Sequence, residues 1–176
     1  MTHRWVDTHG GFHLLLADEL LHYWRGIEGW YDHADPNDQS DYARASRVTT
    51  YVGAVPCQAG TAMVLGGDVG LIAWMPSLLR NRGFLVQWLY ADDEQSIESV
   101  VKSATIANLL EGPDTETIKF NTGPSGRMWL FDSAYAGDEL PDDSELLRLE
   151  PGDYRMRANY FESKALAIVV REIARI

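Results

Sequence analysis

The residues best suited to chemistry are a histidine and three aspartates in one loop-like segment. His33 lies among Asp32, Asp35 and Asp38. Carboxylate oxygens and an imidazole nitrogen can together hold a divalent ion. An acidic loop is more often simply solvated, so two interpretations of this segment stay open. We predict no metal site, and we keep a divergent metal-dependent hydrolase built on this segment as an alternative.

Other catalytic signatures are incomplete. The glycine-rich segment 66–70 follows an expected strand, but it lacks the Gly-Lys-Ser/Thr ending of a phosphate-binding loop. Ser125 lies between turn residues without the spacing of a nucleophile elbow. Cys57 is the only cysteine, and no neighbouring base would lower the pKa of its thiol. We therefore predict no enzyme activity, no catalytic residue and no cofactor.

The elements that would position these side chains are mainly short strands. Apolar, β-branched or aromatic runs bounded by Gly, Pro or Asn are typical of strands. Such runs occupy 12–16, 61–65, 71–75, 83–90, 117–121, 128–131, 154–160 and 165–173. In the run 83–90, large apolar side chains alternate in a way that indicates at least one buried face.

Two segments favour helices. Ile97, Val100, Val101 and Ala104 recur at helical spacing, which predicts one principal helix over about 94–111. Asp18 is a suitable N-cap for a short helix near 18–25. Few helices among many strands, without β-α-β alternation, predict an α+β fold with a mainly antiparallel β-sheet. A chain of 176 residues is the size of one domain, which we expect to span 1–176.

Negative charge is concentrated in two stretches of this acidic chain, whose formal net charge is -11. The first holds Glu28, Asp32, Asp35, Asp38 and Asp41; the second holds Asp132, Asp138, Glu139, Asp142, Asp143 and Glu145. Such a surface repels nucleic acid and anionic membranes and attracts basic partners. We expect neither nucleic acid nor membrane as a partner. The apolar runs fall well short of the roughly 20 residues of a membrane span, so we expect a cytoplasmic location.

Trp30 and Tyr31 adjoin the first acidic stretch and follow no periodic pattern. Aromatic side chains beside charges are typical of protein interfaces, although packing over the end of the sheet explains them equally well. Loops tolerate variation, so partner specificity is more naturally encoded there. The predicted contact residues are Glu28, Trp30, Tyr31, Asp32, Asp35, Asp38, Asp41, Asp138, Glu139, Asp142 and Asp143.

A series of short motifs runs along nearly the whole chain. It comprises Trp5-Val6, Asp18-Glu19-Leu20-Leu21-x-x-Trp24-x-Gly26, Asp41-Tyr42-x-Arg44-Ala45, Val86-x-Trp88-x-Tyr90-Ala91-Asp92, Phe131-Asp132-x-Ala134-Tyr135-x-Gly137 and Pro151-Gly152-x-Tyr154. Each motif alone is unspecific, but their order resembles immunity protein family 21 (Imm21) of bacterial polymorphic toxin systems. The segment 28–40 is unusually acidic for this pattern, and no proline follows Gly67. Both departures concern which toxin is recognised.

The resemblance implies a bacterial antitoxin that binds a cognate secreted toxin domain, often a nuclease, and so protects the producing cell. A clustered negative field would speed association with a basic toxin. A housekeeping protein-interaction module of the same composition is the main alternative.

Overall fold

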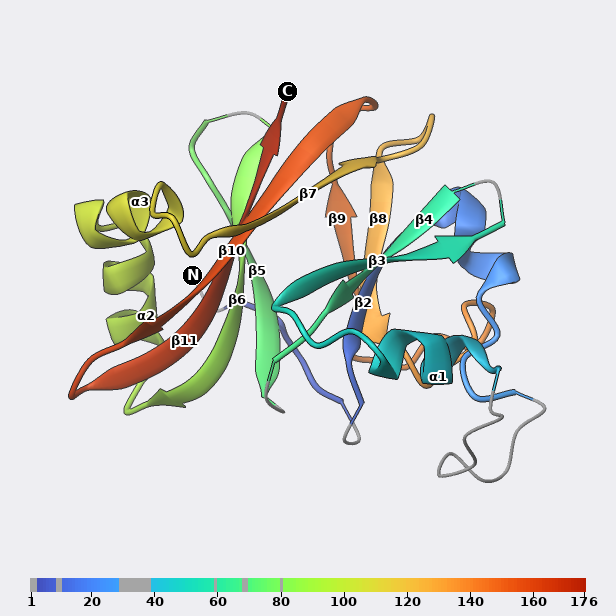
Figure 1. Ribbon diagram of the computed structural model, residues 1–176, viewed down its shortest axis with the longest axis horizontal. Coiled ribbons are helices and arrows are strands. Elements are labelled where there is room, and N and C mark those ends of the chain that lie inside the picture. Colours follow the sequence, from blue (N-terminus) through green and yellow to red (C-terminus); the bar gives the residue numbers. More distant parts are fainter. Residues whose placement is uncertain (1–2, 9–10, 29–38, 59, 68–69, 80) are drawn as a thin grey trace.

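Two antiparallel β-sheets packed face to face form the centre of the molecule (Figure 1). The computed structural model describes residues 3–8, 11–28, 39–58, 60–67, 70–79 and 81–176. The elements, in chain order, are β1 (Trp5–Val6), β2 (His13–Ala17), the 3₁₀-helix η1 (Asp18–Tyr23), α1 (Asp41–Ser46), β3 (Val52–Cys57), β4 (Gly60–Leu65), β5 (Leu71–Pro76), β6 (Arg82–Ala91), α2 (Glu94–Val101), α3 (Ala104–Leu110), β7 (Glu116–Asn121), β8 (Arg127–Asp132), β9 (Glu145–Arg148), β10 (Asp153–Glu162) and β11 (Leu166–Arg175).

The strand order is β1-β5-β6-β11-β10-β7 in one sheet, called sheet A here, and β3-β4-β2-β8-β9 in the other, sheet B. All the strand pairings of the described residues are antiparallel. The structure thus confirms the predicted α+β fold with a mainly antiparallel β-sheet.

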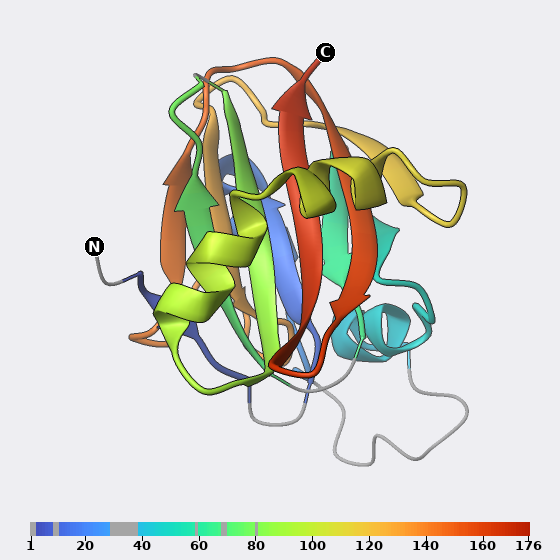
Figure 2. The ribbon, with the colours of Figure 1, turned by 90° about the vertical axis from the view of Figure 1, so that its left-hand side faces the viewer.

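The buried apolar side chains form three clusters, which lie on the faces of the two sheets. Side chains of both sheets form the middle cluster, which includes Leu15 and Leu85. Helices α2 and α3 cover the outer face of sheet A, where Val86 and Ile168 are buried (Figure 2). Adjacent residues of a strand point to opposite faces, so the neighbours Leu85 and Val86 belong to different clusters. Strand β6 is therefore buried on both sides.

The predicted principal helix is two helices. Ser103 has an extended backbone (φ −82°, ψ 159°) and lies between the end of α2 and the start of α3. Its hydroxyl donates to the carbonyl of Val100 at 2.6 Å, which closes the last turn of α2. The break gives each helix its own buried side chains on sheet A, among them Ile97 and Ile106. The apolar periodicity continues across the break, so it could not reveal it.

Three strands (β1, β3 and β9) and one helix (α1) were not predicted from the sequence. Strand β3 contains Gly53 and Pro56, which are unusual inside a strand. It is an edge strand of sheet B, where a residue without an N–H group is tolerated. Strands β1 and β9 are short and also lie at sheet edges. Helix α1 has six residues and is capped by the Ser40 hydroxyl, which accepts from Ala43 N at 3.1 Å. In the parts of the chain described here, no helix has the length and apolar character needed to cross a bilayer.

Candidate functional site

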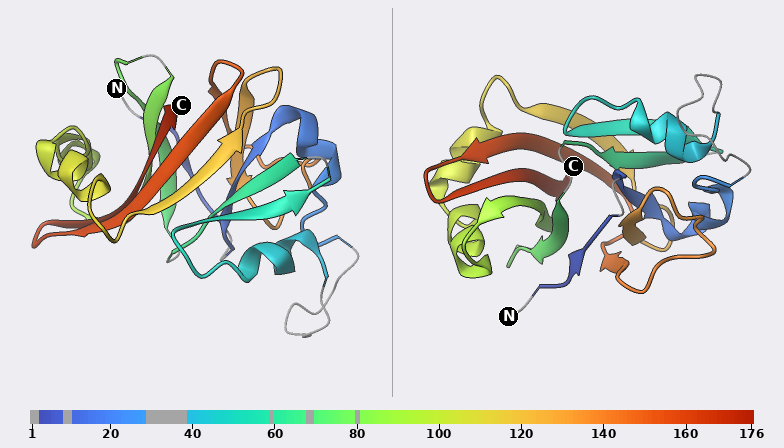
Figure 3. Two further views of the ribbon diagram at one scale, coloured as in Figure 1. Left: turned by 45° about the horizontal axis from the view of Figure 1, so that its top comes forward. Right: turned by 90° about the horizontal axis from the view of Figure 1, so that it is seen from below.

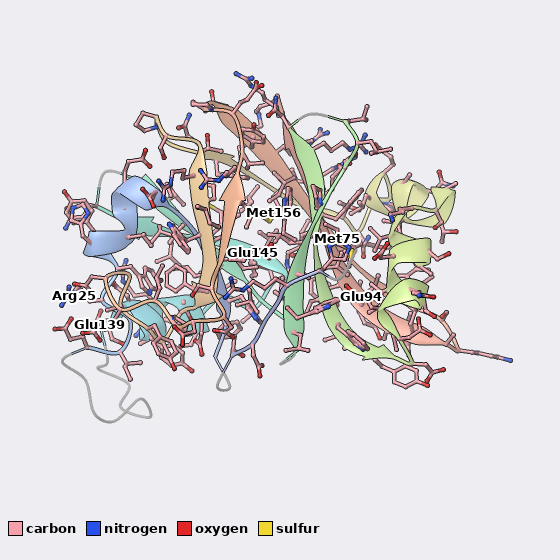
Figure 4. All side chains as sticks on the ribbon, turned by 180° about the vertical axis from the view of Figure 1, so that it is seen from behind. Arg25, Met75, Glu94, Glu139, Glu145 and Met156 are labelled. Atoms are coloured by element: carbon pink, nitrogen blue, oxygen red, sulfur yellow. The ribbon has the colours of Figure 1, made fainter. Side chains whose placement is uncertain are left out.

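The two acidic stretches meet at a cavity of about 580 Å³ next to sheet B. Its lining comprises Arg25, Ile27, Glu28, Asp132, Ala134, Tyr135, Ala136 and Glu139. Arg25 and Glu139 lie close together at one end of the molecule (Figure 4). This cavity is called the Arg25 cavity below.

The Arg25 cavity lies where the segment after η1 packs against the turn after β8 and forms hydrogen bonds with it. Trp24 is fully buried, and its indole Nε1 donates to the carbonyl of Ser133 at 3.0 Å. The carbonyl of Trp24 accepts from Gly137 N at 2.8 Å. Gly26 has a φ of +55°, and a Cβ there would lie 2.2 Å from the Ala134 carbonyl oxygen. Only glycine permits both the left-handed backbone and this close approach.

Arg25 joins the two acidic stretches. Its guanidinium donates to Asp138 Oδ2 at 3.0 Å and also pairs with Glu28. Its backbone N–H donates to Asp41 Oδ2 at 2.7 Å. The hydrogen bonds to Glu28 and Asp138 raise the pKa of Arg25, which therefore stays charged. The guanidinium of Arg25 thus balances carboxylates from both stretches, one of them 113 residues away from it in sequence.

Helix α1 brings a second guanidinium to the same region. Arg44 pairs with Asp41 and donates to the carbonyl of Pro56 at 2.7 Å. The backbone N–H of Tyr42 donates to the carbonyl of Gly26 at 3.1 Å. These bonds hold the start of α1 against the segment that carries Arg25 (Figure 3).

Asp132 forms the floor of the cavity. Only 1% of it is exposed, and its Oδ1 accepts from Ala134 N at 2.9 Å. At the rim, Ile27 is 40% exposed. Carboxylates, one guanidinium and an exposed apolar side chain are a set suited to binding a cationic group of another molecule.

The predicted contact residues fall into three groups according to where the structure places them. The structure brings together Glu28, Asp41, Asp138 and Glu139. It places Asp142 and Asp143 against the N-terminal segment instead: Arg4 donates to the Asp142 carbonyl, and Asp143 Oδ2 accepts from Asp7 N at 3.0 Å. Trp30, Tyr31, Asp32, Asp35 and Asp38 lie outside the described residues, as does the hydrolase candidate His33.

Sequence reasoning missed Arg25, Ile27 and Tyr135 as members of the site. A usable signal was present, because the motif from Asp18 to Gly26 and the motif from Phe131 to Gly137 both belong to the family pattern. These two motifs contact each other through Trp24 and Ser133 and through Gly26 and Ala134.

Cys57 has the environment of an unreactive thiol. It is 2% exposed in the core between sheet B and η1. Burial raises the pKa of its thiol, so little thiolate forms near neutral pH.

Comparison with known proteins agrees with the family pattern. The model of the family "Immunity protein 21" matches residues 4–166, which covers most of the chain. No curated protein and no solved structure gave a significant match. The family is one of immunity proteins against toxins, and membership suggests a non-enzymatic role. The chain therefore belongs to the immunity protein 21 family.

Proposed function

We propose that this protein neutralises a cognate toxin by binding it directly, and that the Arg25 cavity is part of the contact surface. The observation that carries the proposal is the convergence of separate acidic segments on one cavity. Five carboxylates, those of Glu28, Asp41, Asp132, Asp138 and Glu139, lie at or beside it, together with the guanidinium groups of Arg25 and Arg44.

The pairing of Arg25 indicates what this surface can bind. Its guanidinium already lies between Glu28 and Asp138, so the local geometry suits a planar, charged donor. An arginine or lysine of the toxin would find carboxylates in the same place, and Ile27 at the rim would add an apolar contact. The expected partner is a basic toxin domain acting in the cytoplasm. A nuclease fits this description, because it binds phosphates with basic side chains.

The direct experiment is co-expression with the toxin encoded beside this gene. We expect survival of the cells and a stable complex that co-purifies. A folded, monodisperse protein that neither protects the cells nor co-purifies with that toxin would refute the proposal.

Removing charge at the Arg25 cavity should slow association. We expect the combined substitutions Glu28→Gln, Asp138→Asn and Glu139→Gln to lower the association rate about tenfold at low salt and to flatten its salt dependence. Electrostatic steering acts before contact, so the dissociation rate should change less. Stopped-flow or surface-based kinetics over a salt series would measure both rates.

A matched control removes the same net charge elsewhere. Asp92→Asn, Asp114→Asn and Glu162→Gln change three exposed carboxylates associated with sheet A and its helices. Exposed charges that are more than about 10 Å apart are largely screened from each other, so charges far from the contact surface should matter little. This control should therefore slow association about twofold or less. Equal slowing by both triple variants would show that net charge matters and the Arg25 cavity does not.

A further inference from the structure

A second group of polar side chains lies on the opposite side of the molecule, where the N-terminal segment reaches helix α2. His3 Nε2 is 3.2 Å from Glu98 Oε1, and the backbone N–H of His3 donates to Glu94 Oε1 at 2.9 Å. One ligand atom from each of His3, Glu94 and Glu98 lies within 4.8 Å of the others. Figure 4 shows Glu94 on α2.

We propose that His3, Glu94 and Glu98 form a binding site for a divalent transition-metal ion of the Zn²⁺ type. Zinc accepts imidazole nitrogen and carboxylate oxygen at about 2.0–2.2 Å. Two tetrahedral ligands at such distances are about 3.3 Å apart, close to the separation of His3 and Glu98. The ligand atom of Glu94 lies within 4.8 Å of the other two, so it must move closer by at most about 1.5 Å, which rotation of a long side chain can supply.

The backbone holds these ligands in place before any ion binds. Glu94 and Glu98 are four residues apart on α2 and therefore share one face of the helix. Ile97 and Val101 anchor α2 on sheet A. His3 precedes β1, in which Trp5 packs edge-to-face on Trp88 with ring centroids 5.2 Å apart.

Charge and access also suit a cation. The side chains of His3 and Glu98 are 15% and 23% exposed, so their electrostatic interactions are less screened than on an open surface. Lys102, with a side chain 71% exposed, pairs with Glu98 at 2.7 Å and can move into solvent when an ion replaces it. A neutral imidazole and two carboxylates balance a charge of 2+.

The site also borders a cavity of about 670 Å³ between sheet A and helices α2 and α3, and both His3 and Glu98 line it. Water from this cavity can supply the remaining coordination position. An ion here would tie the segment before β1 to α2. Since β1 has only two residues and lies at the edge of sheet A, the bound ion would hold β1 and the residue His3 before it in place. The proposal is independent of toxin binding.

The test is titration of the complete chain, without a purification tag, with ZnCl₂ by calorimetry. We expect one ion per chain, and weakening of at least tenfold in His3→Gln and in Glu98→Gln, because even outer-shell changes cost about 10–100-fold. His22→Gln and Glu162→Gln, which alter exposed residues elsewhere, should bind as the unmodified protein does.

Several results would overturn the metal site. These are no zinc binding, unchanged binding in His3→Gln, or equal weakening in His22→Gln. Thermal unfolding provides a second readout: zinc should raise the melting temperature of the unmodified protein and not that of His3→Gln. His3 precedes β1 and is not part of the apolar core, so His3→Gln should keep the fold even if Glu98→Gln disturbs α2. The toxin is absent from both measurements, so they can fail without affecting the proposed function.

Discussion

Replacing Glu172 with glutamine should lower the free energy of unfolding by about 3 kcal/mol, because it breaks a buried ion-pair network. Glu172 lies on β11 and is 1% exposed. Its carboxylate accepts from Arg82 Nε at 2.7 Å and from Arg157 Nε at 2.9 Å, and it pairs with both guanidinium groups through further contacts. Glutamine keeps the size but removes the charge, and it presents an N–H donor where two cations need an acceptor.

Urea unfolding near neutral pH would measure this loss. Glu162→Gln is the matched control, because Glu162 is exposed at the end of β10. An exposed substitution of this kind changes stability by about 0.5 kcal/mol or less. If Glu172→Gln cost no more than the control, the network around Glu172 would contribute nothing to stability.

Acid should destabilise the protein through His13, by about 3 kcal/mol between pH 6.5 and 4. His13 is 2% exposed on β2, and its Nε2 donates to the carbonyl of Val6 at 2.9 Å. Burial lowers the pKa of His13 to about 4. The Val6 carbonyl and the charge of Asp132 oppose this shift, and the charge of Arg171 adds to it.

The direction in which stability changes with pH follows from which state of the chain binds the proton. Above pH 6.5, His13 is neutral in both the folded and the unfolded chain, so its contribution to stability is constant. Between that pH and 4, the unfolded chain binds a proton that the folded chain excludes. Stability therefore falls by about 1.4 kcal/mol for each pH unit across this window.

Comparison of the unmodified protein with His13→Gln isolates this effect. Glutamine can donate to the Val6 carbonyl but does not titrate. From about pH 7 to about pH 4, the unmodified protein should lose about 3 kcal/mol more unfolding free energy than His13→Gln does. Carboxylates titrate in both proteins and cancel. His22→Gln should keep the full acid sensitivity, and an identical pH dependence of all three proteins would exclude His13 as the cause.

Local patterns in the chain were enough to predict most of the fold. Alternation in 83–90 predicted a strand, and β6 covers that run from Arg82 to Ala91. The predicted segments 61–65 and 71–75 correspond to β4 and β5. Such patterns report which faces of an element are buried, and this depends on residues close together in the chain.

The same patterns failed where a local signal is ambiguous. The helical spacing from Ile97 to Ala104 continues across Ser103, so the division into α2 and α3 could not be read from it. Strand β3 was not predicted because Gly53 weakens a strand pattern and Pro56 is acceptable in a sheet mainly at an edge strand. Whether a strand lies at an edge depends on the other strands.

The sequence by itself determined the types of element, the two acidic stretches and the family pattern. Only the tertiary structure decided which of these residues meet. Arg25 pairs with Asp138 across 113 residues. The backbone of His3 reaches Glu94 across 91 residues. Strand order and register set these encounters, because a shift of one residue in a strand turns every side chain to the opposite face. The Arg25 cavity and the proposed metal site of His3, Glu94 and Glu98 therefore form only when the sheets assemble.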